Sequence, residues 1–96
     1  MSDLTVDHEE TGSKGRYFIV HDAGESELTY SVASPALKIA DHTAVAQGQE
    51  GLGIGLIMLR AFVDDARRNG FKILPLCPFV NAQRRKHPEW ADVFSV

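Results

Sequence analysis

The clearest helical pattern in the sequence covers residues 54–69, and it constrains the fold more than any other feature. On a helix of 3.6 residues per turn, the apolar side chains of this segment form one stripe that consists of Leu56, Leu59, Phe62, Val63 and Ala66. Arg67 and Arg68 fall in the last turn, where they suit the helix dipole, and Gly70 follows as a C-terminal cap. The segment therefore predicts an amphipathic helix that buries one face.

Strand patterns lie on both sides of this helix. Before it, β-branched, aromatic or alternating segments predict strands over residues 4–10, 16–22, 27–34 and 37–45, and one further strand is predicted over residues 71–80. Short turns join the first four strands, which should be antiparallel. The helix between the fourth and fifth strands implies a right-handed crossover and a parallel pair. A short helix over residues 82–86, with Asn81 as its N-cap, completes the order.

The expected architecture is therefore α+β, with a mixed sheet in the order β-β-β-β-α-β-α. A chain of 96 residues is long enough for one hydrophobic core, so we expect residues 1–96 to form a single domain. Pro75 and Pro78 lie inside the fifth strand candidate, although central strands do not accept proline. This strand must lack ladder partners at those two points.

The fourth strand candidate carries a histidine near its end. Its apolar parity consists of Leu37, Ile39, Thr43 and Val45, interrupted by Asp41. His42 falls on the opposite face if no bulge intervenes.

Charge and cysteine content limit the function classes. A net charge of −3 argues against a general nucleic-acid or membrane-surface binder, and no apolar run approaches the ~20 residues of a membrane span. The basic run at residues 84–86 leaves nucleic-acid binding as an alternative function, and the affinity of such binding would depend steeply on salt concentration. Cys77 is the single cysteine, and the N-terminal residues lack the apolar region of a signal peptide. We expect a cytoplasmic protein.

Three glycines open the helix in the stretch QEGLGIGLIML. Gly51, Gly53 and Gly55 would let backbone N–H groups approach an anion closely, and the helix N-terminus favours negative charge, so a pyrophosphate is the natural ligand. The spacing is neither that of a Walker loop nor that of the dinucleotide fingerprint. The alternative is that the glycines only make a tight turn and allow close helix packing. Their spacing leaves both readings open.

Residues 41–90 resemble the core of the GNAT superfamily of acetyl-CoA-dependent N-acetyltransferases, and in particular its very small single-domain members. The resemblance is carried by HTAV at the strand end, by the glycine loop, by the helix end ARRNG and by LCPFV followed by HPEW. It implies that acetyl-CoA lies where the fourth and fifth strands splay apart. Such a gap accounts for Pro75 and Pro78, which cannot donate to a ladder.

The resemblance also implies a set of residues that bind acetyl-CoA, and no metal. The glycine loop and helix start meet the pyrophosphate, the end of the fourth strand meets the pantetheine arm, and the basic helix meets the nucleotide. The residues assigned to the cofactor are Ala44, Val45, Gly51, Leu52, Gly53, Ile54, Gly55, Cys77, Phe79, Asn81, Arg84 and Arg85.

Two side chains are candidates for catalysis. By resemblance, Cys77 lies near the acetyl thioester, where it either accepts the acetyl group or lines the pocket; the alternative is a buried, inert cysteine. His42 lies near the end of the fourth strand, where it could take a proton from the substrate ammonium, because histidine exchanges protons near neutral pH. The alternative for His42 is a structural strand histidine, and Asp41 remains open as a base.

The chain departs from the superfamily pattern in three ways. Glu50 stands where the loop usually has Arg or Gln, with Gln49 one residue too early, and a carboxylate there should repel a pyrophosphate. No tyrosine follows the fifth strand, because the two tyrosines are Tyr17 and Tyr30, so water or Cys77 would have to protonate the departing thiolate. The two C-terminal strands that usually help form the acceptor site are also missing.

The sequence therefore predicts an N-acetyltransferase that binds acetyl-CoA and acts on an amine it does not identify. The open acceptor side favours a protein or peptide amine, or a partner subunit that completes the pocket. The alternative is a non-catalytic CoA-binding or protein-interaction module, which the three departures favour. The oligomeric state is open.

Overall fold

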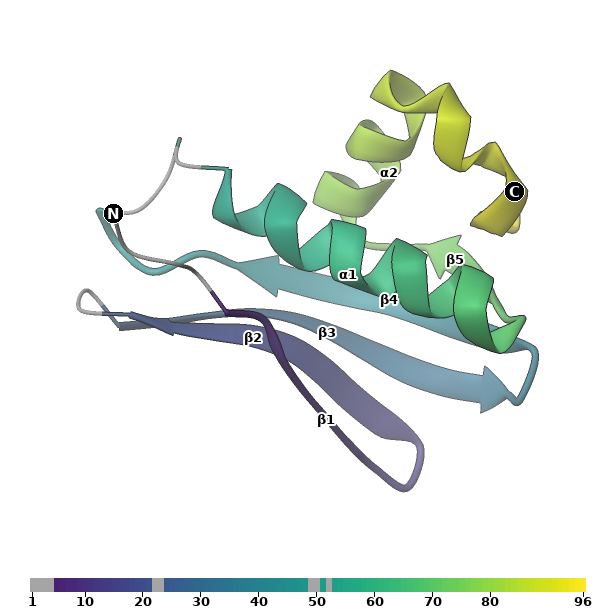
Figure 1. The fold of residues 1–96 in the computed structure, drawn as a ribbon, viewed down its shortest axis with the longest axis horizontal. Helices are drawn as coiled ribbons and strands as arrows, with labels where there is room; N and C mark the ends of the chain where they lie inside the picture. The colour runs from purple at the N-terminus through teal and green to yellow at the C-terminus, as the bar shows by residue number, and fades with distance from the viewer. Residues whose placement is uncertain (1–4, 22–23, 49–50, 52) are drawn as a thin grey trace.

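The computed structural model describes residues 5–21, 24–48, 51 and 53–96 (Figure 1). Its elements, in chain order, are β1 (Asp7–Thr11), β2 (Lys14–His21), β3 (Gly24–Ser34), β4 (Leu37–Ala44), α1 (Ile54–Asn69), β5 (Lys72–Pro75), α2 (Pro78–Lys86) and the 3₁₀ helix η1 (Pro88–Val93).

The five strands form one sheet in the order β1-β2-β3-β4-β5. The pairs β1–β2, β2–β3 and β3–β4 are antiparallel, whereas β4 and β5 are parallel and are joined through α1. The expected α+β architecture with a mixed sheet is thereby confirmed. The predicted strand bounds differ from the observed ones by a few residues, and the predicted ends Leu4 and Asp22 lie outside the described residues.

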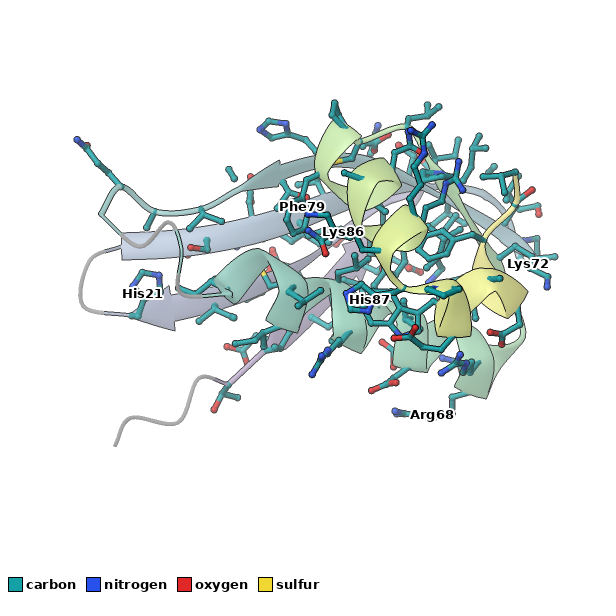
Figure 2. All side chains as sticks on the ribbon, turned by 90° about the horizontal axis from the view of Figure 1, so that it is seen from above. His21, Arg68, Lys72, Phe79, Lys86 and His87 are labelled. Carbon is teal, nitrogen blue, oxygen red and sulfur yellow. The ribbon has the colours of Figure 1, made fainter. Side chains whose placement is uncertain are left out.

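All the helices lie on one face of this sheet (Figures 1 and 2). Burial alternates along β2 and β3 accordingly, so that Tyr17 and Tyr30 are buried beneath α1, and the Phe62 ring lies 5.1 Å and 5.0 Å from theirs. The opposite face carries no helix in the part of the chain that is described. The hydrophobic core is therefore one-sided.

The buried face of α1 agrees with the predicted stripe except at its start. Leu59, Phe62, Val63 and Ala66 are buried, but Leu56 is only half-buried. Additional buried side chains of α1 are Ile54 and Met58.

A β-bulge in β4 overturns the predicted parity of that strand. Thr29 of β3 pairs with His42, but the next residue, Tyr30, pairs with Ala40, so Asp41 is an extra, unpaired residue. Ala40 is therefore buried toward the helices, while Leu37 and Ile39 lie on the other face and Thr43 does not share their parity. An inserted residue moves everything after it to the opposite face, and alternation alone could not reveal it.

The predictions for residues 71–86 are wrong in two respects. β5 ends at Pro75 instead of extending to residue 80, because α2 begins at Pro78 with Cys77 as its N-cap residue. Asn81 lies inside α2 and is not its N-cap. Proline is well suited to the first position of a helix, where its missing N–H costs nothing, so Pro78 is the better start signal.

We expect Gly15→Ala to lower the stability of the fold by about 1–3 kcal/mol, the usual cost of overpacking. A Cβ at Gly15 would lie 2.4 Å from Cζ of Tyr30, whose ring is fully buried. Urea unfolding followed by circular dichroism measures the loss. Val20→Ala on the same strand is the control, because Val20 is 62% exposed and its replacement should cost much less. Equal losses would contradict the packing of Tyr30 beneath Gly15.

Candidate functional site

β4 and β5 separate after only four residue pairs. Their parallel pairing runs from Leu37 and Lys72 to Ala40 and Pro75. One further bond joins the strands, in which the Cys77 N–H donates to the Ala40 carbonyl at 2.9 Å. The chain then turns into α2, while β4 continues to Ala44 without a β5 partner among the described residues.

A pocket of about 430 Å³ lies beside the end of β4, and it is lined from three segments of the chain. The sequence assigned six of its residues to cofactor binding: Val45, Gly51, Gly53, Ile54, Gly55 and Phe79. Two further lining residues, Leu56 of α1 and Gln83 of α2, were not predicted. Gln83 stands four residues after Phe79, a spacing that identifies one helical face once the start of α2 is placed at Pro78.

The N-terminus of α1 opens at this pocket without a side-chain cap. Its N-cap residue is Gly53, with a φ of 76°, a left-handed conformation that glycine adopts without strain. No side chain hydrogen-bonds to this end of the helix and its first turn has no acidic residue, as far as the described residues show. The first amide groups of a helix lack intrahelical partners, so this end can accept an anion.

The glycines of the loop do not share one role. A Cβ at Gly55 would lie 2.8 Å from the Phe79 ring, so Gly55 allows α1 and α2 to pack closely. Gly51 and Gly53 have positive φ angles and nothing within 4 Å of such a Cβ. The packing explanation therefore accounts for Gly55 but not for the other two.

A buried serine fixes the segment that leaves β4. The Ala46 N–H donates to Oγ of Ser26 at 2.9 Å, and Ser26 is fully buried on β3. This bond holds the chain beside the pocket, where Val45 forms part of the wall.

The two predicted catalytic residues flank β4 from opposite sides. Cys77 is only 2% exposed, and its Sγ lies 3.3 Å from Oγ1 of Thr43, on the face covered by the helices. His42 is exposed and pairs with Thr29 on the open face. The structure therefore does not bring Cys77 and His42 together.

Four other residues assigned to the cofactor, Ala44, Asn81, Arg84 and Arg85, are not among those that line the pocket. Ala44 ends β4, while Asn81 accepts a hydrogen bond from Nε of Arg84 at 2.8 Å, and Arg85 is exposed. Helical periodicity places Lys86, seven residues after Phe79, on the pocket side of α2 instead (Figure 2).

The centre of the predicted loop falls on residues that the structure does not describe. These residues are Leu52, Gln49 and Glu50.

The two tyrosines belong to the core. The hydroxyl of Tyr17 donates to Asp65 at 2.7 Å, and that of Tyr30 donates to Glu10 at 2.6 Å. Burial raises the pKa of both phenols.

Comparison with known proteins identifies the family. The model of the family described as GCN5-related N-acetyl-transferase matches residues 16–93. The chain belongs to this family. As a GCN5-related N-acetyltransferase, it is also similar to a solved structure, the NMR solution structure of a GCN5-like candidate N-acetyltransferase from Staphylococcus aureus. The TM-score is 0.74 at 30% sequence identity, over 99% of this chain and 91% of that one. No curated protein matches.

The described residues of this N-acetyltransferase show neither a metal-binding cluster nor a membrane-spanning helix. They contain no group of three or more His, Cys, Asp or Glu side chains arranged to hold a metal ion. They also include no helix with the length and apolar character needed to cross a membrane.

Proposed function

We propose that the protein binds acetyl-CoA in the pocket between the start of α1, the end of β4 and α2, and transfers the acetyl group to an amine. One observation carries the proposal. The uncapped N-terminus of α1 opens into a pocket beside the part of β4 that has no β5 partner among the described residues.

The residues around this pocket fit a long ligand with an anionic group near its middle. The first backbone amides of α1, at Gly53 and Ile54, suit a diphosphate, because the helix dipole adds to their hydrogen-bonding capacity. Leu56 and Phe79 provide apolar walls for a flexible chain, and the backbone at Val45, directly after β4, can hydrogen-bond to its amides. Lys86 is placed to attract further phosphate.

The family reaction joins an amine nitrogen to the acetyl carbon and releases coenzyme A as a thiol, while the amine loses a proton. We assign the removal of that proton to His42. It lies on the open side of β4, so it can meet an incoming amine and pass the proton to water. Backbone N–H groups near the parting of β4 and β5 would polarise the thioester carbonyl.

We place Cys77 on the cofactor side of β4. Its thiol lies at the N-terminus of α2 and next to the Thr43 hydroxyl. Cys77 therefore either receives the acetyl group or protonates the departing thiolate, the role for which no tyrosine is available.

Acetyl-CoA should raise the melting temperature of the protein markedly. At 100 times the dissociation constant, a ligand that binds only the folded state adds ~2.7 kcal/mol of stability. For a domain of this size, that corresponds to roughly 10–20 °C. Differential scanning fluorimetry measures the shift, with AMP at the same concentration as the control. An unchanged melting temperature in acetyl-CoA would contradict the proposed binding.

Release of free coenzyme A separates the enzyme from the non-catalytic alternative. A thiol assay with a lysine-containing peptide should detect release by the native protein. Cys77→Ala should retain the thermal shift and lose most of the release. A shift without release, from the native protein with any amine, would favour a CoA-binding or interaction module.

A further inference from the structure

The sheet face opposite the helices carries an excess of negative charge among the described residues. The pairing of β1 to β4 directs two cationic and five anionic side chains to this face: Lys14, Arg16, Asp7, Glu9, Glu25, Glu27 and Asp41. Lys72, at the edge of β5, turns its ammonium to the Asp92 carbonyl of η1 instead. Among the described residues, this face therefore has an excess of three negative charges.

Arg16 holds three of these carboxylates without neutralising them. Its Nε donates to Glu9 at 3.0 Å, and its Nη1 donates to Glu27 at 2.9 Å and also to Glu25. Hydrogen bonds from Arg16 to Glu25 and Glu9 raise the pKa of Arg16 further, so it stays charged. One positive charge leaves two negative charges in excess, and the three carboxylate side chains remain 35–58% exposed. They are therefore oriented and accessible to a partner.

The same face is hollowed next to this cluster. A depression of about 500 Å³ has walls contributed by all of β1 to β4, including Glu9, Lys14, Arg16 and Asp41. Nζ of Lys14 is already bound to Oγ of Ser31 at 2.8 Å and lies 4.0 Å from Asp41. The hollow and the Arg16 cluster together extend across four strands. This surface is large enough to contact several cationic side chains and not only one ammonium group.

We infer that this open face docks a cationic stretch of polypeptide, rich in lysine or arginine, that carries the acceptor amine. Charge complementarity selects this partner, since an anionic membrane or a nucleic acid would be repelled by the face. The surface is also continuous with the proposed acceptor side of β4, because Asp41 and His42 project at the bulge where β4 leaves β5. The role as acceptor rests on the proposed function, but the docking does not.

Titration of the ¹⁵N-labelled protein with hexalysine tests the docking directly. Amide shifts should change along β1, β2 and β3, and binding should weaken as salt rises to about 0.3 M. Glu27→Gln should weaken hexalysine binding about threefold to fivefold, the range for an exposed ion pair. Asp64→Asn is the matched control, because it removes the same charge from an exposed position on α1. Hexaglutamate should leave the spectrum unchanged.

Several outcomes would overturn the docking. These are shifts that map to the helices, equal effects of Glu27→Gln and Asp64→Asn, binding of spermine as tight as that of hexalysine, and self-association through the open face on sedimentation. Failure here is distinguishable from failure of the proposed function. The acetyl-CoA thermal shift of Glu27→Gln should equal that of the native protein. If neither protein shows a thermal shift, the proposed function is contradicted but the docking is not.

Discussion

Phe62→Ala should destabilise the protein by about 3–5 kcal/mol, the range for removing a buried aromatic ring. Phe62 is fully buried at the centre of the one-sided core, and its ring lies within 6 Å of those of Tyr17, Tyr30 and Phe71. A domain of this length has only about 5–14 kcal/mol of stability in total. A large part of the folded population would therefore be lost on moderate heating. Urea denaturation gives the change in free energy, with the slope of the transition showing whether unfolding stays two-state.

The matched control is Phe18→Ala, which removes the same ring from the open face of the sheet. Phe18 is half-buried, and its main partner is the Arg16 guanidinium at 4.0 Å from the ring centroid. Its loss should cost about 1 kcal/mol, the scale of a cation–π contact at an exposed site. A similar cost for Phe18→Ala and Phe62→Ala would mean that the open face is covered in solution.

The sheet order and the α1 core could be predicted because their signals are local and repeated. Leu59, Phe62, Val63 and Ala66 recur at helical spacing, and short turns leave few ways to connect the first four strands. The predicted lack of a ladder partner at Pro75 is wrong, because Pro75 pairs with Ala40 as the last residue of β5. The strands separate directly after it, as expected near a residue that has no N–H to donate.

Several details of the site could not be predicted from the alternation of apolar and polar residues. The bulge at Asp41 follows from pairing with β3, so it decides from outside the strand which face His42 occupies. Asn81 looked like a cap because its side chain suits one, yet Pro78 starts α2 three residues earlier. That shift of start is also why Gln83 was missed.

The open face illustrates a further limit of the sequence. The residues that meet around Arg16 come from three strands, and their spacing along the chain shows no motif. A net charge of −3 looked modest when spread over the chain. The pairing of β1 to β4 gathers five carboxylates and only two cations of the described residues on one surface, so this local charge is a property of the fold.

Gln83→Glu should weaken acetyl-CoA binding about tenfold, a change of ~1.4 kcal/mol. Gln83 lines the pocket at the N-terminus of α1, and glutamate keeps its size while adding one negative charge. A charge placed near a bound diphosphate repels it, and partial burial limits screening by salt. Isothermal titration calorimetry measures the affinity, and the melting temperature without ligand should remain close to that of the native protein.

Asn81→Asp provides the matched control for this variant, because it adds the same charge to the same helix on the side away from the pocket. The new carboxylate would keep the oxygen that accepts the hydrogen bond from Arg84, so the fold should tolerate it. We expect the affinity of this variant for acetyl-CoA to stay within about twofold of the native value, since charges in water interact weakly beyond the first few ångströms. Equal losses of acetyl-CoA affinity in the two variants would mean that the added charge acts through the net charge of the protein and not through its position in the pocket. Full affinity in Gln83→Glu would place the diphosphate elsewhere, and the α1 N-terminus would lose its assigned role.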